Sequence, residues 1–279
     1  MKKLLITAAA FSVALIGCKT TEPPTFEQET NDIYVWDESK STAKNWADIA
    51  VVPNGVKDAE RAEDAQELIS EAEQNAWTLV SLASGGLAQG LGMSSVFGII
   101  EDAQRWWPTY VLLAGPQQLT AESVLTQIEA KFEPMFNDSN QFNYHGVSYR
   151  THSRNYANLS FLVSGKGCNY TTSYEESNQQ VLNMPPSFEG CFIEAMVKVM
   201  PRVKLPSGKL ADVISIEQRV SSKYSLSLAQ HFDGPVVFPV NYKVQVDGND
   251  TQIPFPFVYY NDKAHLFIKS DATLELDIR

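Results

Sequence analysis

The sequence predicts an α+β protein, in which an N-terminal helical segment with an alanine-rich heptad seam precedes a mainly antiparallel β-sheet. Small and apolar residues recur at helical spacing within 58–136. Apolar and polar residues alternate over much of 137–279, and two successive hairpin signals near the end of the chain predict a C-terminal meander. The composition, 44% hydrophobic and 20% charged, is that of a globular protein.

The first eighteen residues have the pattern of an export signal. Two lysines precede an uncharged apolar run, 4–16, which is shorter than the ~20 residues that a membrane-spanning helix needs. The residues Leu15-Ile16-Gly17-Cys18 resemble the lipobox of bacterial lipoproteins. The resemblance implies removal of residues 1–17, two acyl chains on Cys18 and a third on the new N-terminus. Since each buried methylene contributes ~0.8 kcal/mol, such an anchor is expected to hold stably.

The resemblance also implies a location. In lipoproteins of the Gram-negative type, an aspartate after the acylated cysteine retains the protein at the inner membrane, whereas this chain has Lys19. We therefore expect an outer-membrane lipoprotein whose body lies in the periplasm or at the cell surface. The formal net charge of −11 disfavours nucleic acid and anionic lipid surfaces, so the lipid is expected to hold the chain on the membrane without a basic patch.

Residues 18–57 are expected to form the lipid anchor and a tether. Pro23 and Pro24 disfavour a helix and keep the chain extended. Two short β-prone runs, 33–36 and 49–52, are expected to dock on the main sheet.

A long helix is expected to begin at Asp58, which is a suitable N-cap residue. The alanine-rich seam behind it has alternating spacings of three and four and consists of Ala62, Ala65, Ile69, Ala72, Ala76, Leu79 and Ala83. Such small side chains let a second helix approach closely. That helix belongs either to the same chain or to another molecule, which is an envelope protein partner or a second copy in a homo-oligomer.

The segment 76–100 contains five glycines and no charged residue. It is long enough to cross a bilayer, and Gly86 and Gly90 form a Gly-x-x-x-Gly pair of the kind that packs membrane helices. A buried helix, a glycine-rich elbow and a second short helix explain the same pattern, because glycine disfavours a helix by ~1 kcal/mol per residue. Membrane insertion and a soluble elbow both stay open.

The elements after residue 119 have clearer local signals. Thr120 is a suitable N-cap of a helix whose apolar face runs from Val124 to Phe136. Alternation and turn residues predict strands at 156–163, 192–199, 240–246, 253–259 and 274–278, with turns at Asp247-Gly248 and Asn261-Asp262.

The two remaining cysteines, Cys168 and Cys191, are expected to form a disulfide in an oxidising periplasm. It would close a loop of 22 intervening residues and stabilise the fold by ~3 kcal/mol in the chain-entropy model. A metal or redox pair is the alternative, but the chain has no Cys-x-x-Cys motif.

No local signature of an enzyme is present in the sequence, so we assign no catalytic residue, metal or cofactor. The four histidines are isolated from one another: His145, His152, His231 and His265. Arg150 and Arg154 form a small basic island that suits contact with an anion, and a solvated hairpin turn explains them equally. The aromatic stripe 255–259 suits a sugar or a peptide, and it also suits core packing.

The leading hypothesis is a lipid-anchored envelope lipoprotein with a non-enzymatic binding or scaffolding role, whose expected contact surface is the alanine-rich seam. The first alternative is a periplasmic hydrolase of cell-wall or carbohydrate substrates, which needs a histidine and a carboxylate within hydrogen-bond reach in a cleft. The second is an oligomeric lipoprotein that inserts segment 76–100 into the membrane.

Overall fold

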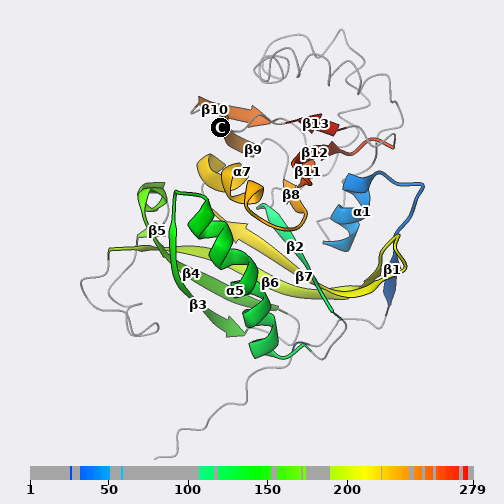
Figure 1. Cartoon of the computed structure of the whole chain (residues 1–279), viewed down its shortest axis with the longest axis horizontal. Helices are drawn as coiled ribbons and strands as arrows, with labels where there is room; N and C mark the ends of the chain where they lie inside the picture. The colour runs from blue at the N-terminus through cyan, green and yellow to red at the C-terminus, as the bar shows by residue number, and fades with distance from the viewer. Residues whose placement is uncertain are drawn as a thin grey trace, which may run out of the picture.

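The computed structural model describes residue 26, residues 32–50, residue 58 and most of residues 107–275 (Figure 1). Within the last range it leaves out residues 116–118, 152–155, 171, 174–188, 221, 239–241, 247–248, 254–255 and 270–272. The export signal, the alanine-rich seam and segment 76–100 therefore lie outside the described residues.

Eleven strands form one large sheet. In chain order they are β1 (Ile33–Val35), β2 (Thr109–Ala114), β3 (Asn143–Thr151), β4 (Tyr156–Ser164), β5 (Thr172–Ser173), β6 (Cys191–Lys204), β7 (Leu210–Arg219), β8 (Val236–Phe238), β11 (Phe257–Tyr260), β12 (Lys263–Leu266) and β13 (Thr273–Glu275). Their order in space is β13-β12-β11-β8-β2-β7-β6-β4-β3, with β1 and β5 also paired to β6. All these pairs are antiparallel except β1 with β6.

The remaining described elements are helices and one small sheet. The helices are α1 (Thr42–Ile49), α5 (Ala121–Asp138), α7 (Ser222–Gln230) and the 3-10 helix η2 (Lys166–Tyr170). The strands β9 (Tyr242–Val246) and β10 (Asn249–Ile253) form a separate antiparallel pair.

β6 has four partners because it extends past its neighbours at both ends. β4 and β7 flank its middle. Its last residues, 202–204, lie beyond the end of β4 and pair with β1. Its first residues, 191–192, lie beyond the end of β7 and pair with β5. β1 therefore lies at the closed end of the long β6–β7 hairpin, far from β5 (Figure 1).

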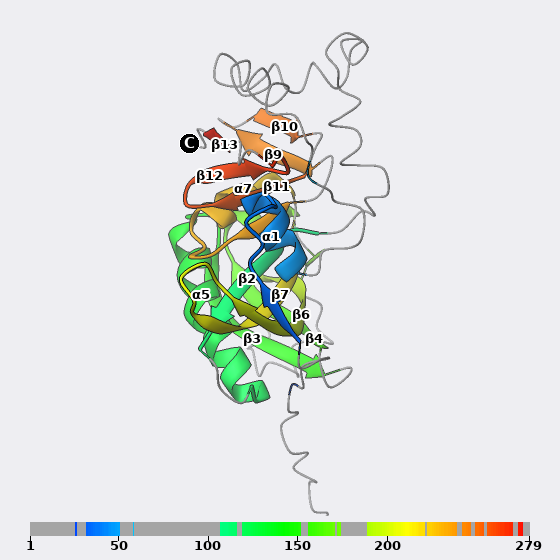
Figure 2. The same cartoon turned by 90° about the vertical axis from the view of Figure 1, so that its right-hand side faces the viewer.

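The sheet carries helices on both faces. Alternation along β2 places Tyr110 on one face, where its ring centroid lies 5.3 Å from that of Phe132 in α5. Ser215 of β7 points to the other face, where its hydroxyl donates to the carbonyl of Ala50 at the end of α1. α5 and α1 thus cover opposite faces of the sheet, as the view from the side also indicates (Figure 2).

The N-terminus of α5 confirms the predicted cap at Thr120. The Thr120 hydroxyl accepts from the Ser123 N–H at 3.1 Å, and the Ser123 hydroxyl accepts from the Thr120 N–H at 2.9 Å, so both backbone donors are satisfied. The buried face of the helix ends in an aromatic cluster. Phe132 stacks on Phe161 of β4 with centroids 4.9 Å apart, which fixes α5 over the middle of the sheet.

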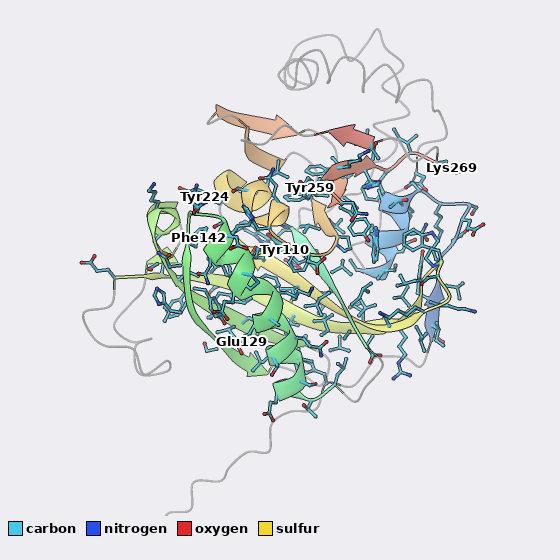
Figure 3. All side chains as sticks on the ribbon, in the orientation of Figure 1. Tyr110, Glu129, Phe142, Tyr224, Tyr259 and Lys269 are labelled. Carbon is cyan, nitrogen blue, oxygen red and sulfur yellow. A yellow bond between two sulfur atoms is a disulfide. The ribbon has the colours of Figure 1, made fainter. Side chains whose placement is uncertain are left out.

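The same core continues beneath α7. Phe142 meets Tyr224 of α7 edge to face, with ring centroids 5.5 Å apart, and Tyr110 meets Phe232 in the same way at 4.9 Å. Figure 3 shows Tyr110, Phe142 and Tyr224 in the space between the helices and the sheet. One hydrophobic core therefore joins α5, α7 and the sheet.

The predicted fold class, α+β with a helical N-terminal segment, is wrong for the described residues. They form a mostly antiparallel β-sheet with three α-helices of 8, 18 and 9 residues. Residues 109–114, which the prediction placed in the helical segment, are β2 near the centre of the sheet. Since both faces of β2 are covered, five of its six residues are buried, and an apolar run without alternation does not distinguish a strand from a helix.

The single predicted C-terminal meander is also wrong. The β9–β10 hairpin forms its own sheet, whereas β11 to β13 extend the main sheet through β8. The Asn261-Asp262 turn is confirmed, because both residues have positive φ, 50° and 61°, between the antiparallel β11 and β12. The predicted strands 156–163 and 192–199 are confirmed as β4 and β6.

Candidate functional site

Residues assigned to the tether pack onto the folded body. Phe26 is buried, and its N–H donates to the carbonyl of Leu119 at 3.1 Å. The run 33–36 docks on the sheet as expected and contains β1, whereas Ile49 ends α1 and does not begin a strand. We call residues 32–50, which comprise β1, a turn and α1, the N-terminal clasp.

Asn45 is the centre of the clasp and is fully buried. Its Oδ1 accepts from the Asp37 N–H at 2.9 Å and from the Tyr34 hydroxyl at 3.1 Å. Its Nδ2 donates to the carbonyls of Asp37 at 2.9 Å and Ser41 at 3.0 Å. One side chain therefore ties the strand, the turn and the helix together with all its polar atoms satisfied.

Charged groups surround this centre. Lys40 and Lys44 both pair with Asp48, the former at 3.1 Å. Burial raises the pKa of Tyr34 to about 12, with a further contribution from Asp48. Burial lowers the pKa of Lys40, but its hydrogen bond and charge interaction with Asp48 outweigh burial and raise that pKa overall. The clasp is thus a polar unit in which the Tyr34 phenol stays neutral.

Asp58 lies at the start of α1. Ser41 is the N-cap of α1, and its hydroxyl accepts from the Lys44 N–H at 3.0 Å. The Asp58 carboxylate accepts from the N–H of Ser41 at 2.8 Å and from its hydroxyl. This carboxylate therefore places negative charge at the positive end of the α1 dipole, a role that the sequence analysis did not identify.

Aromatic rings cover the other side of α1. Trp46 meets Trp36 and Tyr260 edge to face, with ring centroids 5.4 and 5.6 Å apart. His265 lies next to Tyr260, and its Nε2 is 3.2 Å from the Tyr260 carbonyl oxygen. The Trp46 Nε1 is buried and has no hydrogen-bond partner within the described part of the chain. These rings fill the junction between α1 and β11 by packing against one another, which is a structural role.

The described histidines come from separate parts of the fold: His145 lies in β3, His231 follows α7 and His265 lies in β12. His145 Nε2 lies 2.8 Å from the Ser164 hydroxyl, and His231 is exposed. His152 lies outside the described residues. Within the described ranges there is no group of three or more histidine, cysteine and acidic side chains that could hold a metal ion.

Tyr144 and Glu129 form a polar contact between β3 and α5. The Tyr144 hydroxyl donates to the Glu129 carboxylate at 3.1 Å. Burial, followed by this carboxylate, raises the pKa of Tyr144, so the phenol stays protonated and remains a donor. The contact lies beside the stack of Tyr144 on Phe136, with centroids 6.2 Å apart, and is best explained as support for the core.

The candidate sites chosen from sequence are mostly separate from the clasp. Cys168 and Cys191 are disulfide-bonded, with Cα atoms 5.4 Å apart, at the β5 end of β6. Arg150 lies in β3 opposite Asn158, in a hairpin whose connection carries Arg154 outside the described residues. Cys18 and the seam residues also lie outside the described residues.

Most of the aromatic stripe serves the core. Phe257 stacks on Phe238 with ring centroids 4.6 Å apart, and both are buried. Burial, with a smaller contribution from Asp262, raises the pKa of Tyr259 to about 12. Core packing, one of the two interpretations of the stripe, is therefore the one that the described residues support.

The clasp was missed from sequence although part of it had a signal. Ser41 followed by apolar positions at Trp46, Ile49 and Ala50 has the pattern of a short capped helix. The nearby prolines led to the assignment of a tether. The central role of Asn45 had no local signal, because its partners are brought together only by the fold.

Comparisons of the chain with protein-family models, curated proteins and solved structures find no match. No helix among the described residues is long and apolar enough to cross a membrane.

Proposed function

We propose that this chain is a lipid-anchored lipoprotein of the bacterial envelope with a non-enzymatic binding or scaffolding role. The observation that carries the proposal is the lipobox-like sequence at residues 15–18, behind a short apolar run. The lipid on Cys18 holds the folded body at the outer membrane. Lys19, which stands where an aspartate would retain the protein at the inner membrane, favours transport to the outer membrane.

Two structural features support this proposal. The disulfide between Cys168 and Cys191 fits an oxidising compartment outside the cytoplasm. Phe26, only eight residues after Cys18, is already buried in the body. A short connection from the lipid to the folded sheet suits a protein that works at the membrane surface.

The anchor is tested by metabolic labelling with palmitate followed by fractionation of the envelope. Wild type and the matched variant Thr20→Ser are expected to incorporate the label and to pellet with outer membranes. Cys18→Ser is expected to lose the label, and Lys19→Asp is expected to keep it and move to the inner membrane. Wild type that incorporates no label would contradict the proposal.

The binding role is assigned to the alanine-rich seam, and a second copy is its simplest partner. Sedimentation velocity in detergent, over a series of protein concentrations, is expected to show a larger species for wild type. Ala72→Glu places a charge in the seam and is expected to abolish that species, whereas the neighbouring Asn75→Glu is expected to preserve it. A single monomeric species for all three proteins would exclude self-assembly through the seam.

A further inference from the structure

β1 exposes two aliphatic side chains. Ile33 is 48% exposed and Val35 is 60% exposed, and among the described residues the other exposed large hydrophobic is Trp107. Because side chains alternate along a strand, Ile33 and Val35 lie on one side of β1 and Tyr34 lies on the other. Tyr34 points inward to Asn45, so the two aliphatic side chains point away from the clasp.

Two cations lie beside these side chains. The parallel register places Arg202 next to Ile33 and Lys204 next to Val35, on the same face of the sheet. Arg202 is held by the buried Asp212, with Nε 2.7 Å from the carboxylate, and its side chain remains 40% exposed. Lys204 is exposed and forms no ion pair with a described residue. We call these two aliphatic residues and two cations the β1 patch.

Asp212 pairs with Arg202, so Lys204 supplies the net positive charge of the β1 patch, and the other acidic residues near β1 do not cancel it. Asp32 lies on the Tyr34 side of the strand by alternation. Asp37 accepts from the N–H and the hydroxyl of Ser39, and these hydrogen bonds lower its pKa and keep its charge within the turn. The β1 patch is therefore amphipathic and locally basic on a chain whose formal net charge is −11.

The β1 patch is also close to the expected anchor. At ~3.3–3.6 Å per residue, the eight residues from Cys18 to Phe26 span at most about 29 Å, and the seven from Phe26 to Ile33 at most about 25 Å. A compact body of this size has a radius of gyration of about 18 Å. The connection thus keeps Phe26, and with it the folded body, within about 29 Å of the lipid-bearing Cys18.

We propose that the β1 patch rests on the phospholipid surface, with Ile33 and Val35 at the boundary of the acyl chains and Arg202 and Lys204 at the phosphates. Small aliphatic groups flanked by cations are the chemistry that favours this boundary. The inference rests on the proposed function, because the lipid supplies the affinity and the patch sets only the orientation. The acidic remainder of the protein is repelled by anionic headgroups, which favours the same orientation.

The test uses the full acylated protein in vesicles of phosphatidylethanolamine and phosphatidylglycerol. An environment-sensitive dye is attached to Val35→Cys or to the matched control Asp138→Cys, an exposed residue at the end of α5. The dye at 35 is expected to shift to shorter wavelength and to be quenched by a lipid-attached quencher, and the dye at 138 is not. Adding Ile33→Asp or Lys204→Glu is expected to reduce the response at 35, with the fold checked by circular dichroism.

The outcomes separate the inference from the proposed function. Acylated, vesicle-bound protein with equal dye responses at 35 and 138 overturns the docking of the β1 patch alone. A response at 35 that follows protein concentration and ignores the quencher also overturns it, since association with a second copy then covers the β1 patch. Protein without palmitate overturns the proposed function, and this is measured on the same sample before vesicles are added.

Discussion

Replacing Asn45 with alanine is expected to lower the free energy of unfolding by about 1–2 kcal/mol. The Ser41 carbonyl keeps its helical hydrogen bond from the Asn45 N–H at 3.0 Å, and the Tyr34 hydroxyl keeps Asp48 at 3.5 Å. The loss therefore falls on the Asp37 N–H and on the weaker bond to the Lys40 carbonyl at 3.4 Å, because the Asp37 carbonyl still accepts from the Lys40 N–H at 3.1 Å. Each buried polar group left without a partner costs about 1–3 kcal/mol, and Asp37 is only half-buried. The higher helix propensity of alanine offsets about 0.5 kcal/mol.

The assay is equilibrium unfolding in urea followed by tryptophan fluorescence, because Trp36 and Trp46 report directly on the clasp. Amide hydrogen exchange across 32–50 is expected to show the largest loss of protection. Asn45→Leu keeps the side-chain volume without the hydrogen bonds and is expected to destabilise similarly. The exposed Glu38→Ala in the same turn is the control. If Asn45→Ala shifts the unfolding free energy no more than Glu38→Ala does, the hydrogen bonds do not hold the clasp.

Three further perturbations test the core, the disulfide and the titration of the clasp. A Cβ on Gly167 would lie 2.1 Å from two ring atoms of the buried Phe142. Gly167→Ala is therefore expected to destabilise the fold by an overpacking cost of about 1–3 kcal/mol, measured as a lower melting temperature. Gly115→Ala, whose Cβ meets no atom within 4 Å, is expected to be nearly neutral. Reduction of the disulfide is expected to cost about 3 kcal/mol in urea unfolding, and equal midpoints with and without reductant would show that it adds nothing. The fold raises the pKa of Tyr34 from 10.0 to about 12. The stability that the neutral phenol contributes is therefore complete below pH 10 and is lost as the pH rises towards 12. Tyr34→Phe is expected to flatten the loss of thermal stability over that window, and an unchanged slope would assign the loss to other groups.

Sequence reasoning succeeded where the signal is local. The Thr120 cap and the apolar face behind it predict α5, since both signals come from residues that are neighbours in sequence within one helix. The positive φ of Asn261 and Asp262 is the conformation that these residue types tolerate best outside glycine. Alternation at 192–199 predicts the middle of β6 because that part of the strand has exposed residues on one face.

The failures concern properties that only the assembled sheet confers. β2 has no alternation because both of its faces are buried. The pairing of β1 with β6 joins residues about 170 positions apart, and a three-residue strand has no periodicity to predict it. The role of Asn45 also depends on tertiary structure, since its side-chain hydrogen bonds are all formed only when β1 packs against α1.

The register of β1 connects the clasp to the β1 patch. In the observed register Tyr34 lies beside the buried Val203, and Ile33 and Val35 face outward. A slip of one residue would turn Tyr34 outward, break its hydrogen bond to Asn45 and turn the two aliphatic side chains towards the clasp. The buried amide of Asn45 therefore specifies which side of a three-residue strand is exposed. Under the proposed docking, that choice also decides which surface meets the bilayer, so the polar centre of the clasp and the apolar surface of β1 are two consequences of one register.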